Sequence, residues 1–203
     1  KYGVPLNDPC CYPLGLMYVS SYLKYMGHKV KILNYNLYDY DLESEIKDYD
    51  IVGFTGFEEF KSRILRDEKI CLSFGKKTMI GGALTTFDAI PEFQGTQIKG
   101  EMPGIGRIFY DKFIPDYEGY GIQEYHKRHN TIYMGVLTTL GCHLSFTFCT
   151  QTCKFMQRDL KSVMAEIDYY NQHYGCNRIV FNDNTLNITK KRFLKICVNM
   201  KAR

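Results

Sequence analysis

Three cysteines lie within twelve residues of one another in the segment Leu-Gly-Cys-His-Leu-Ser-Phe-Thr-Phe-Cys-Thr-Gln-Thr-Cys, and they are Cys142, Cys149 and Cys153. Cysteine thiolates gathered on one loop are the usual ligands of iron–sulfur clusters. The segment follows a predicted strand, and α/β folds place their active sites at the carboxyl ends of strands. The spacing therefore predicts a metal centre. The competing interpretation is three buried free thiols, because unpaired cysteine is among the most buried residue types.

A histidine beside the first cysteine permits a different metal. Three cysteines and one histidine form a known zinc set, so Cys142, Cys149, Cys153 and His143 are an alternative structural zinc site. Neighbouring residues such as Cys142 and His143 are awkwardly placed to bind one ion, and we therefore favour the iron–sulfur cluster.

The elements that must position this loop are predicted from hydrophobic periodicity. Residues 131–139 and 177–181 are predicted strands, residues 160–174 a helix, and Thr189 the N-cap of another helix. Strands that alternate with helices indicate parallel pairing. Two such units cannot close a barrel, so this part is expected to be the truncated start of a partial (β/α) barrel of the TIM type.

The first half of the chain predicts a separate α/β domain with a Rossmann-like parallel sheet. The apolar run over 50–56 is typical of a strand buried on both faces, while residues 114–130 are polar, rich in tyrosine and without periodicity, which suits a linker. Predicted helices cover residues 13–23, 42–49, 58–74 and 105–113, and predicted strands cover 29–33, 50–56, 77–82 and 97–101.

The predicted organisation has three parts, a Rossmann-like domain over 1–115, a linker over 116–130 and the start of the barrel over 131–203. The sequence begins at Lys1 without methionine and stops inside a helical pattern, so we expect a fragment of a longer protein.

From Thr131 onward the sequence resembles the opening of a radical S-adenosylmethionine core, particularly in the subgroup with an N-terminal cobalamin-binding domain. The family signature is C-x3-C-x2-C, with glycine before the first cysteine and an aromatic residue before the third. Gly141-Cys142 matches its start and Phe148-Cys149 its end. Phe146 stands where the middle ligand belongs, and a phenyl ring cannot ligate iron. The resemblance thus implies a 4Fe-4S cluster with S-adenosylmethionine bound at its open iron, impaired by the missing ligand.

The departure from the signature at Phe146 leaves three alternatives open. Cys153 could fill the vacancy if the loop refolds. A second register uses Cys149, Cys153 and Met156, but thioether is a poor ligand for iron–sulfur clusters and no glycine precedes Cys149. A sequence error or engineered change at Phe146 is the third.

The resemblance also implies a binding site for S-adenosylmethionine. In such enzymes polar groups at strand ends hold the methionine part of the cofactor, which here implies Asn182 and Asp183, and Phe148 is implied to line the adenine pocket. The simpler interpretation of Asp183 is a turn or helix-cap residue. Cys176 and Cys197 lie outside the motif and are expected to be core thiols.

The N-terminal half resembles the cobalamin-binding domain of the same subgroup, in Pro13–Leu16, in Val52–Gly56 and in Ile80-Gly81-Gly82 followed by Thr85-Thr86. Glycines at strand ends let the backbone approach a macrocycle or its nucleotide tail, although plain turn glycines give the same pattern. The D-x-H-x-x-G motif is absent, so any cobalamin would bind without a histidine ligand. The implied cobalamin-binding residues are Thr55, Gly81, Gly82 and Thr85.

Together these features imply a cobalamin-binding radical S-adenosylmethionine enzyme. Its reduced cluster would cleave S-adenosylmethionine to a 5′-deoxyadenosyl radical, for methyl transfer or rearrangement of a small-molecule or peptide substrate, and an electron donor such as flavodoxin or ferredoxin would reduce the cluster. The alternative is a non-catalytic cobalamin- or partner-binding module with a degenerate cysteine loop. We expect a cytoplasmic protein, because the sequence has neither an export leader nor an apolar run of about 18 residues that could cross a membrane.

Charge is unevenly distributed. Residues 131–203 carry 10 Lys and Arg against 4 Asp and Glu, whereas residues 1–130 carry 16 against 18. A basic segment suits an anionic substrate or nucleic acid. The basic residues are scattered at helix-surface spacing, which favours solvated helix faces, and we do not expect nucleic acid as a partner.

Overall fold

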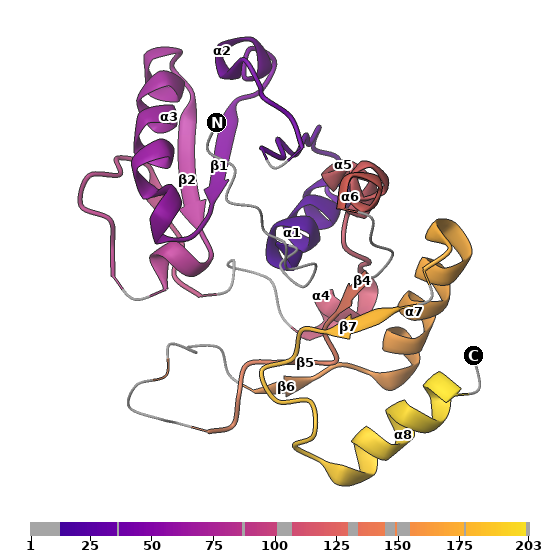
Figure 1. Ribbon diagram of the computed structural model, residues 1–203. Helices are drawn as coiled ribbons and strands as arrows, with labels where there is room; N and C mark the ends of the chain where they lie inside the picture. Colours follow the sequence, from indigo (N-terminus) through magenta and orange to yellow (C-terminus); the bar gives the residue numbers. More distant parts are fainter. Residues whose placement is uncertain are drawn as a thin grey trace.

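The computed structural model arranges the chain as two α/β lobes (Figure 1). We name the described residues between 42 and 98 the N-lobe, and residues 14–25 together with those between 107 and 201 the C-lobe. None of the described helices is long and apolar enough to cross a bilayer. The structure describes residues 13–35, 37–86, 88–100, 107–129, 134–144, 149, 155–176 and 178–201.

The N-lobe contains a three-stranded parallel sheet in the order β1-β2-β3. The chain passes from one strand to the next through helices, as in a Rossmann-like fold, and the predicted α/β class with a parallel sheet is confirmed. Its strands are β1 (Ile51–Thr55), β2 (Lys77–Gly81) and β3 (Thr96–Gln97), and its helices are α2 (Leu42–Glu45), the 3-10 turns η1 (Glu58–Phe60) and η2 (Ala83–Thr85), and α3 (Lys61–Ser73).

β1 is more exposed than its apolar sequence predicts. Ile51, Gly53 and Thr55 are exposed, while Val52 and Phe54 are half-buried. The reason is position, because β1 lies at one edge of the described sheet and pairs there with β2 alone. The prediction of a strand buried on both faces is therefore wrong.

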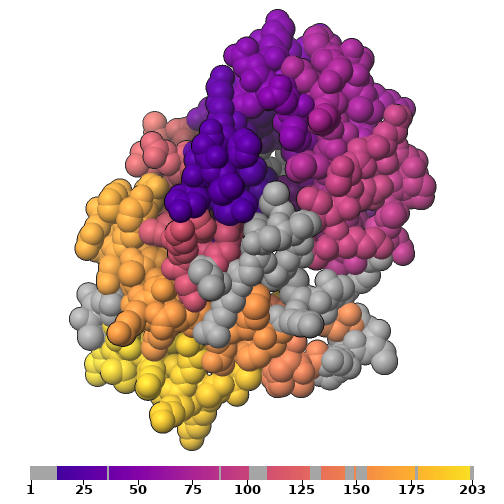
Figure 2. All heavy atoms as spheres, turned by 180° about the vertical axis from the view of Figure 1, so that it is seen from behind, coloured from indigo at the N-terminus to yellow at the C-terminus, as the bar shows by residue number. Residues whose placement is uncertain are grey.

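Residues 29–33, predicted as a strand, form no regular element. Their alternating pattern has another cause. Ile32 is buried in the core of the C-lobe, whereas Leu33 packs against a small cluster in the N-lobe that includes Leu42 and Cys71. Successive apolar side chains thus serve two different cores. The view from behind shows the N-terminal residues, coloured indigo, between the magenta N-lobe and the orange and yellow C-lobe (Figure 2).

The C-lobe contains two parallel strands, β4 (Met134–Val136) and β7 (Ile179–Phe181). The helices α7 (Leu160–Tyr174) and α8 (Lys190–Lys201) lie where the periodicity predicts them. A short antiparallel pair, β5 (Thr139–Leu140) with β6 (Met156–Gln157), has no counterpart in the sequence-based prediction.

The segment expected to be an irregular linker is largely helical. It contains α5 (Tyr117–Tyr120) and α6 (Ile122–His129), and it follows α4 (Arg107–Lys112). Its apolar residues belong to the C-lobe core, where tyrosine rings are buried, and the Tyr117 hydroxyl donates to Gly135 O at 2.7 Å. The tyrosine-rich composition suggested an exposed linker, but a tyrosine ring is apolar and can be buried if its hydroxyl finds a hydrogen-bond partner.

α1 (Leu14–Tyr25) packs with the C-lobe, although it precedes the N-lobe in sequence. Leu14, Met17 and Tyr18 share one core with Met134 and Val136 of β4. The chain therefore enters the C-lobe, builds the N-lobe and returns. The three-part division at 1–115, 116–130 and 131–203 stays a prediction.

Asp116 fastens α1 to the start of α5. Its carboxylate accepts from the Ser20 hydroxyl and from Gly119 N at 3.0 Å, and lies 2.7 Å from the Lys24 ammonium. Burial alone would raise the pKa of Asp116, but the hydrogen bonds from Lys24, Ser20 and Gly119 lower it from its ordinary value.

This arrangement predicts an acid-sensitive contribution to stability. A carboxylate with a lowered folded-state pKa stabilises the fold above its unfolded-state pKa of about 3.9, and that contribution is lost as pH falls through the folded-state pKa. Asp116→Asn should lower the free energy of unfolding by about 1–3 kcal/mol at pH 7 and flatten its decline below about pH 4. Urea unfolding across pH measures both effects. The exposed Asp48, substituted as Asp48→Asn, is the control, and an unchanged pH profile in Asp116→Asn would contradict the assignment.

Candidate functional site

Two parallel strands end side by side at the base of the cysteine loop. β4 is buried at all three positions and pairs with β7, with Val136 opposite Phe181. Because the two strands run in the same direction, the residues that follow them meet at one edge. These residues are Thr138 and Thr139 after β4 and Asp183 after β7.

Asp183 fastens the chain that leaves β4. Its Oδ1 accepts from Thr138 N at 3.1 Å and Thr138 Oγ1 at 2.9 Å, and also from the N–H and hydroxyl groups of Thr139. Its Oδ2 accepts from Thr138 N at 3.1 Å. Charge-assisted hydrogen bonds of this kind are stronger than neutral ones. The contacts agree with the turn-residue interpretation of Asp183, and its role toward S-adenosylmethionine stays a prediction.

The next two residues extend these contacts to the loop itself. Asn184 Nδ2 donates to Gly141 O at 3.4 Å, and Thr185 Oγ1 lies 3.7 Å from Cys142 Sγ. We name residues 183–185 the clasp. Asn184 and Thr185 were not among the residues predicted for the site, and their position shortly after β7 is the signal that could have identified them.

Cys142 is held in an environment that favours its thiolate. Leu144 N donates to Cys142 Sγ at 3.4 Å, and this backbone hydrogen bond, followed by that of Thr185, lowers the pKa of the Cys142 thiol. The thiolate is the form that binds metal. The surroundings of Cys142 therefore fit a metal-binding thiolate better than a buried free thiol.

The pair β5–β6 closes the loop at its base. Thr139 lies opposite Gln157 and Leu140 opposite Met156, so the ends of the loop are paired. Met156, the third ligand of the second register, is half-buried in β6. The pairing thus brings the two ends of the loop together.

Cys153 of the predicted metal set lies outside the described residues, and so do Phe146, which departs from the signature, and Phe148, which is implied to line the adenine pocket. Cys149 is described and exposed. Within the described ranges, no group of three or more His, Cys, Asp or Glu side chains is placed to hold a metal ion. The cluster and the zinc alternative both stay predictions. The donor chemistry suits either metal, because the sequence places three thiols on one loop. Cys142 Sγ also accepts a hydrogen bond, as a thiolate would.

The side chain of Asn182 lies beside a different residue from those that the clasp contacts. Its backbone N–H donates to Val136 O at 2.8 Å, and its side chain covers Gly135, where an added Cβ would stand 2.6 Å from Asn182 Oδ1 and 3.4 Å from Leu14 Cδ1. Asn182 and Asp183 thus point to different neighbours. A side chain at position 135 would therefore require the Asn182 side chain to move.

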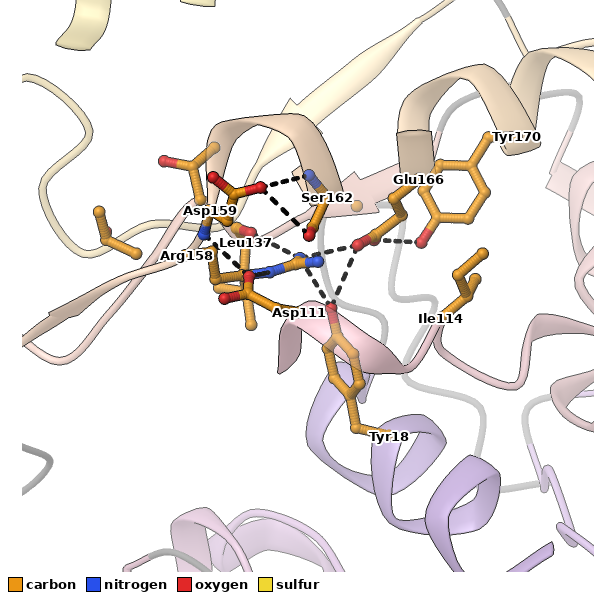
Figure 3. Close-up of polar contacts among 12 residues, drawn as sticks. Tyr18, Asp111, Ile114, Leu137, Arg158, Asp159, Ser162, Glu166 and Tyr170 are labelled. Atoms are coloured by element: carbon orange, nitrogen blue, oxygen red, sulfur yellow. Dashed lines mark hydrogen bonds and ion pairs between the residues drawn. The ribbon is translucent and has the colours of Figure 1, made fainter. Parts of the chain in front are cut away.

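A buried ion pair lies behind the strand ends (Figure 3). Arg158 Nη1 lies 2.7 Å from Glu166 Oε2, and it also donates to Tyr18 Oη at 2.9 Å and Leu137 O at 2.8 Å. Tyr170 donates its hydroxyl to the other oxygen of Glu166. Burial raises the pKa of Glu166, and the Arg158 guanidinium opposes that rise. The pair ties α7 to α1 and to the residue before Thr138.

The residues implied in cobalamin binding lie together at the carboxyl ends of β1 and β2. Thr55 is opposite Gly81, and a Cβ on Gly82, whose φ is +86°, would stand 2.6 Å from Thr55 Oγ1. Thr55 and Gly82 are exposed. Thr85 is fully buried, and its hydroxyl donates to Ile98 O at 2.7 Å. Thr55 and Gly82 are accessible to a ligand and Gly81 is half-buried, whereas the Thr85 hydroxyl is hydrogen-bonded within the lobe.

The two cysteines expected in the core differ. Cys176 is 3% exposed, and its thiol donates to Arg178 O at 3.0 Å. Burial raises the pKa of Cys176. Cys197 is exposed on α8, so the prediction for this residue is wrong. The face of α8 that meets the core is marked instead by the buried Ile196.

The comparisons with known proteins add one finding on activity. No family model matches the chain, and no solved structure matches it. The chain is 25% identical to an uncharacterized methyltransferase from Pyrococcus horikoshii over 241 aligned positions, which cover 93% of this chain and 52% of that protein. The chain thus spans about half the length of the curated relative it matches. Its distant similarity is to a methyltransferase, and this is compatible with a role in methyl transfer.

Proposed function

We propose that the protein is a methyl-transfer enzyme that uses S-adenosylmethionine, and that it belongs to the radical type with an iron–sulfur cluster on the loop of Cys142, Cys149 and Cys153. The distant methyltransferase relative supports the first part. The observation that carries the second part is the position of Cys142, which follows β5 at the base of a closed loop, with its sulfur accepting a hydrogen bond from Leu144 N.

Each part of the site has a distinct task in this proposal. Cys142 and Cys149 would ligate the 4Fe-4S cluster, with Cys153 as a weak substitute for the ligand missing at Phe146. Once reduced by a flavodoxin- or ferredoxin-like donor, the cluster would supply the electron that cleaves S-adenosylmethionine. The clasp would hold the cysteine loop over the ends of β4 and β7. Thr55, Gly81 and Gly82 would meet cobalamin from the N-lobe, with no histidine ligand from the D-x-H-x-x-G motif. The protein would orient the cofactors and exclude water from them.

Anaerobic reconstitution with iron and sulfide tests the proposal. Phe146 lacks a donor atom at the middle ligand position of the family signature, so the wild-type protein should give weak or no iron–sulfur absorbance. Phe146→Cys should restore a cluster with bound S-adenosylmethionine, because it places a thiolate at the middle position of the signature, between Cys142 and Cys149. Iron and sulfide content, together with visible absorbance, measure the outcome.

Cys197→Ser is the matched control, since Cys197 is exposed and outside the loop; it should leave cluster formation in the Phe146→Cys background unchanged. Failure of Phe146→Cys to bind iron would overturn the cluster assignment. Full cluster occupancy in the wild-type protein, with Cys153 dispensable, would overturn the proposed role of position 146.

A non-catalytic cobalamin-binding module is the second candidate, favoured by Phe146 and by the exposed Thr55 and Gly82 at the end of the N-lobe sheet. Titration with hydroxocobalamin separates the two. A saturable spectral shift without any cluster in the Phe146→Cys variant would favour the module.

A further inference from the structure

A basic cavity lies between β6, α7 and α8, in addition to the loop and clasp. Its volume is about 290 Å³, and four cationic side chains line it: Arg158, Lys191, Arg192 and Lys195. Among the described residues that line it, Asp159 alone is acidic. Asp159 is engaged elsewhere, since its carboxylate accepts from Ser162 N at 3.2 Å as the N-cap of α7. We name this cavity the basic pocket.

Hydrogen bonds and ion pairs hold the two arginines in place on one side of the basic pocket. Arg192 Nη2 donates to Arg158 O at 2.7 Å and to Thr138 O at 3.2 Å. Arg158 is 2% exposed, and its guanidinium is committed to Glu166 and Asp111. These contacts hold the back of the pocket in place and connect it to Thr138, the residue held by the clasp.

The two lysines differ from Arg158, whose charge faces the carboxylates of Glu166 and Asp111. Lys191 and Lys195 are exposed and lie one turn apart on α8, and no carboxylate in the described part of the chain forms an ion pair with either. The first turn of α8 contains no acidic residue, although it carries Lys190, Lys191 and Arg192. Cations at the amino end of a helix are unfavourable, since that end carries a partial positive charge. A bound anion would offset this repulsion.

We propose that the basic pocket binds a small phosphate-bearing molecule, with Lys191 and Lys195 as its charged contacts and the Thr189 hydroxyl and Gln157 amide as neutral ones. Lysine binds phosphate as a point charge, and two lysines beside neutral donors match a group with two negative charges better than a single carboxylate. A volume of about 290 Å³ is at the lower end of ligand pockets, so the ligand has the size of pyrophosphate or a short phosphate ester. The assignment does not depend on the proposed cluster.

Calorimetric titration of the full chain with pyrophosphate, glycerol 3-phosphate and inorganic phosphate tests this inference, at a constant ionic strength of about 0.15 M. We expect saturable binding of at least one of these probes with a Kd of about 1 mM or tighter. The variant with Lys191→Gln and Lys195→Gln should bind that probe about tenfold more weakly or not at all, because it loses both charge-assisted contacts.

The matched control carries Lys69→Gln and Lys77→Gln, which remove two exposed charges from the N-lobe and should leave the affinity unchanged. Equal weakening in both double variants would show a general effect of net charge and overturn the site. Absence of saturable binding of all three probes to the wild-type protein would overturn it as well. Thermal unfolding without any probe checks that the variants are folded.

Discussion

Glu166→Ala is expected to lower the free energy of unfolding by about 3–5 kcal/mol, because it leaves the Arg158 guanidinium buried without its counter-charge. Arg158 is 2% exposed, and Glu166 Oε2 is the anion nearest to it, 2.7 Å from Nη1. Asp111 Oδ1 lies 3.6 Å from Arg158 Nε and is only a partial substitute. The same change removes the acceptor of the Tyr170 hydroxyl.

Urea unfolding followed by circular dichroism measures the loss. Lys161→Ala, an exposed position in the first turn of the same helix, should change the free energy of unfolding by no more than about 0.5 kcal/mol. A loss below about 1 kcal/mol in Glu166→Ala would mean that the pair is open to water in solution.

A double variant separates the ion pair from simple packing. Arg158→Met with Glu166→Leu removes both charges and keeps two long apolar side chains, so no buried charge remains unpaired. Replacing a buried pair with apolar residues is often close to neutral, although Tyr18 and Tyr170 would still lose a partner. The double variant should therefore be more stable than Glu166→Ala. If the loss in the double variant equals the sum of the losses in Arg158→Met and Glu166→Leu measured singly, the ion pair does not act as a unit.

Sequence patterns predicted helices and strands correctly where burial is one-sided and regular. The periodicity over 160–174 coincides with α7, and the apolar runs at 50–56 and 77–82 contain β1 and β2. They failed where burial depends on tertiary position. Ile32 and Leu33 are consecutive apolar residues that pack into the cores of two different lobes, and Tyr117 is buried although its surroundings in sequence are polar. No local pattern carries the information that α1 packs with strands more than a hundred residues away.

The candidate site shows the same division. Cysteine spacing pointed to the loop and the family resemblance to Asp183, and their role as a cofactor site stays a prediction. Neither the spacing nor the resemblance gave any sign that Asp183 holds Thr138 and Thr139 rather than standing open to a ligand, because those contacts join residues about 45 positions apart. Thr185 was missed for the same reason, since a threonine after a strand is ordinary until the fold brings it to Cys142.

Asp183→Ala is expected to release the base of the cysteine loop. The side chain accepts from the backbone N–H groups of Thr138 and Thr139, which are 0% and 2% exposed. Each buried donor left unsatisfied costs about 1–3 kcal/mol, so the free energy of unfolding should fall by about 3 kcal/mol. Asp183→Asn keeps one acceptor oxygen but places an amide opposite the Thr138 N–H, and the loss should be intermediate.

Hydrogen exchange distinguishes a local release from general destabilisation. In Asp183→Ala the amides of residues 138–142 should exchange at least about tenfold faster, whereas the amides of β1 and β2 in the N-lobe should change less. Asp88→Ala, at an exposed position of the N-lobe, should alter neither set. Uniform acceleration throughout the chain would contradict a role for the clasp at the loop.

The same variant connects the clasp to the proposed metal centre. In the Phe146→Cys background, Asp183→Ala should reduce the iron retained after anaerobic reconstitution, because Cys142 follows directly from the residues that Asp183 holds. Asp183→Asn should retain an intermediate amount if acceptor geometry sets the loop position. Iron content equal to that of the parent, despite faster exchange over 138–142, would mean that the loop assembles a cluster without the clasp, and residues 183–185 would then serve the stability of the β4–β7 edge alone.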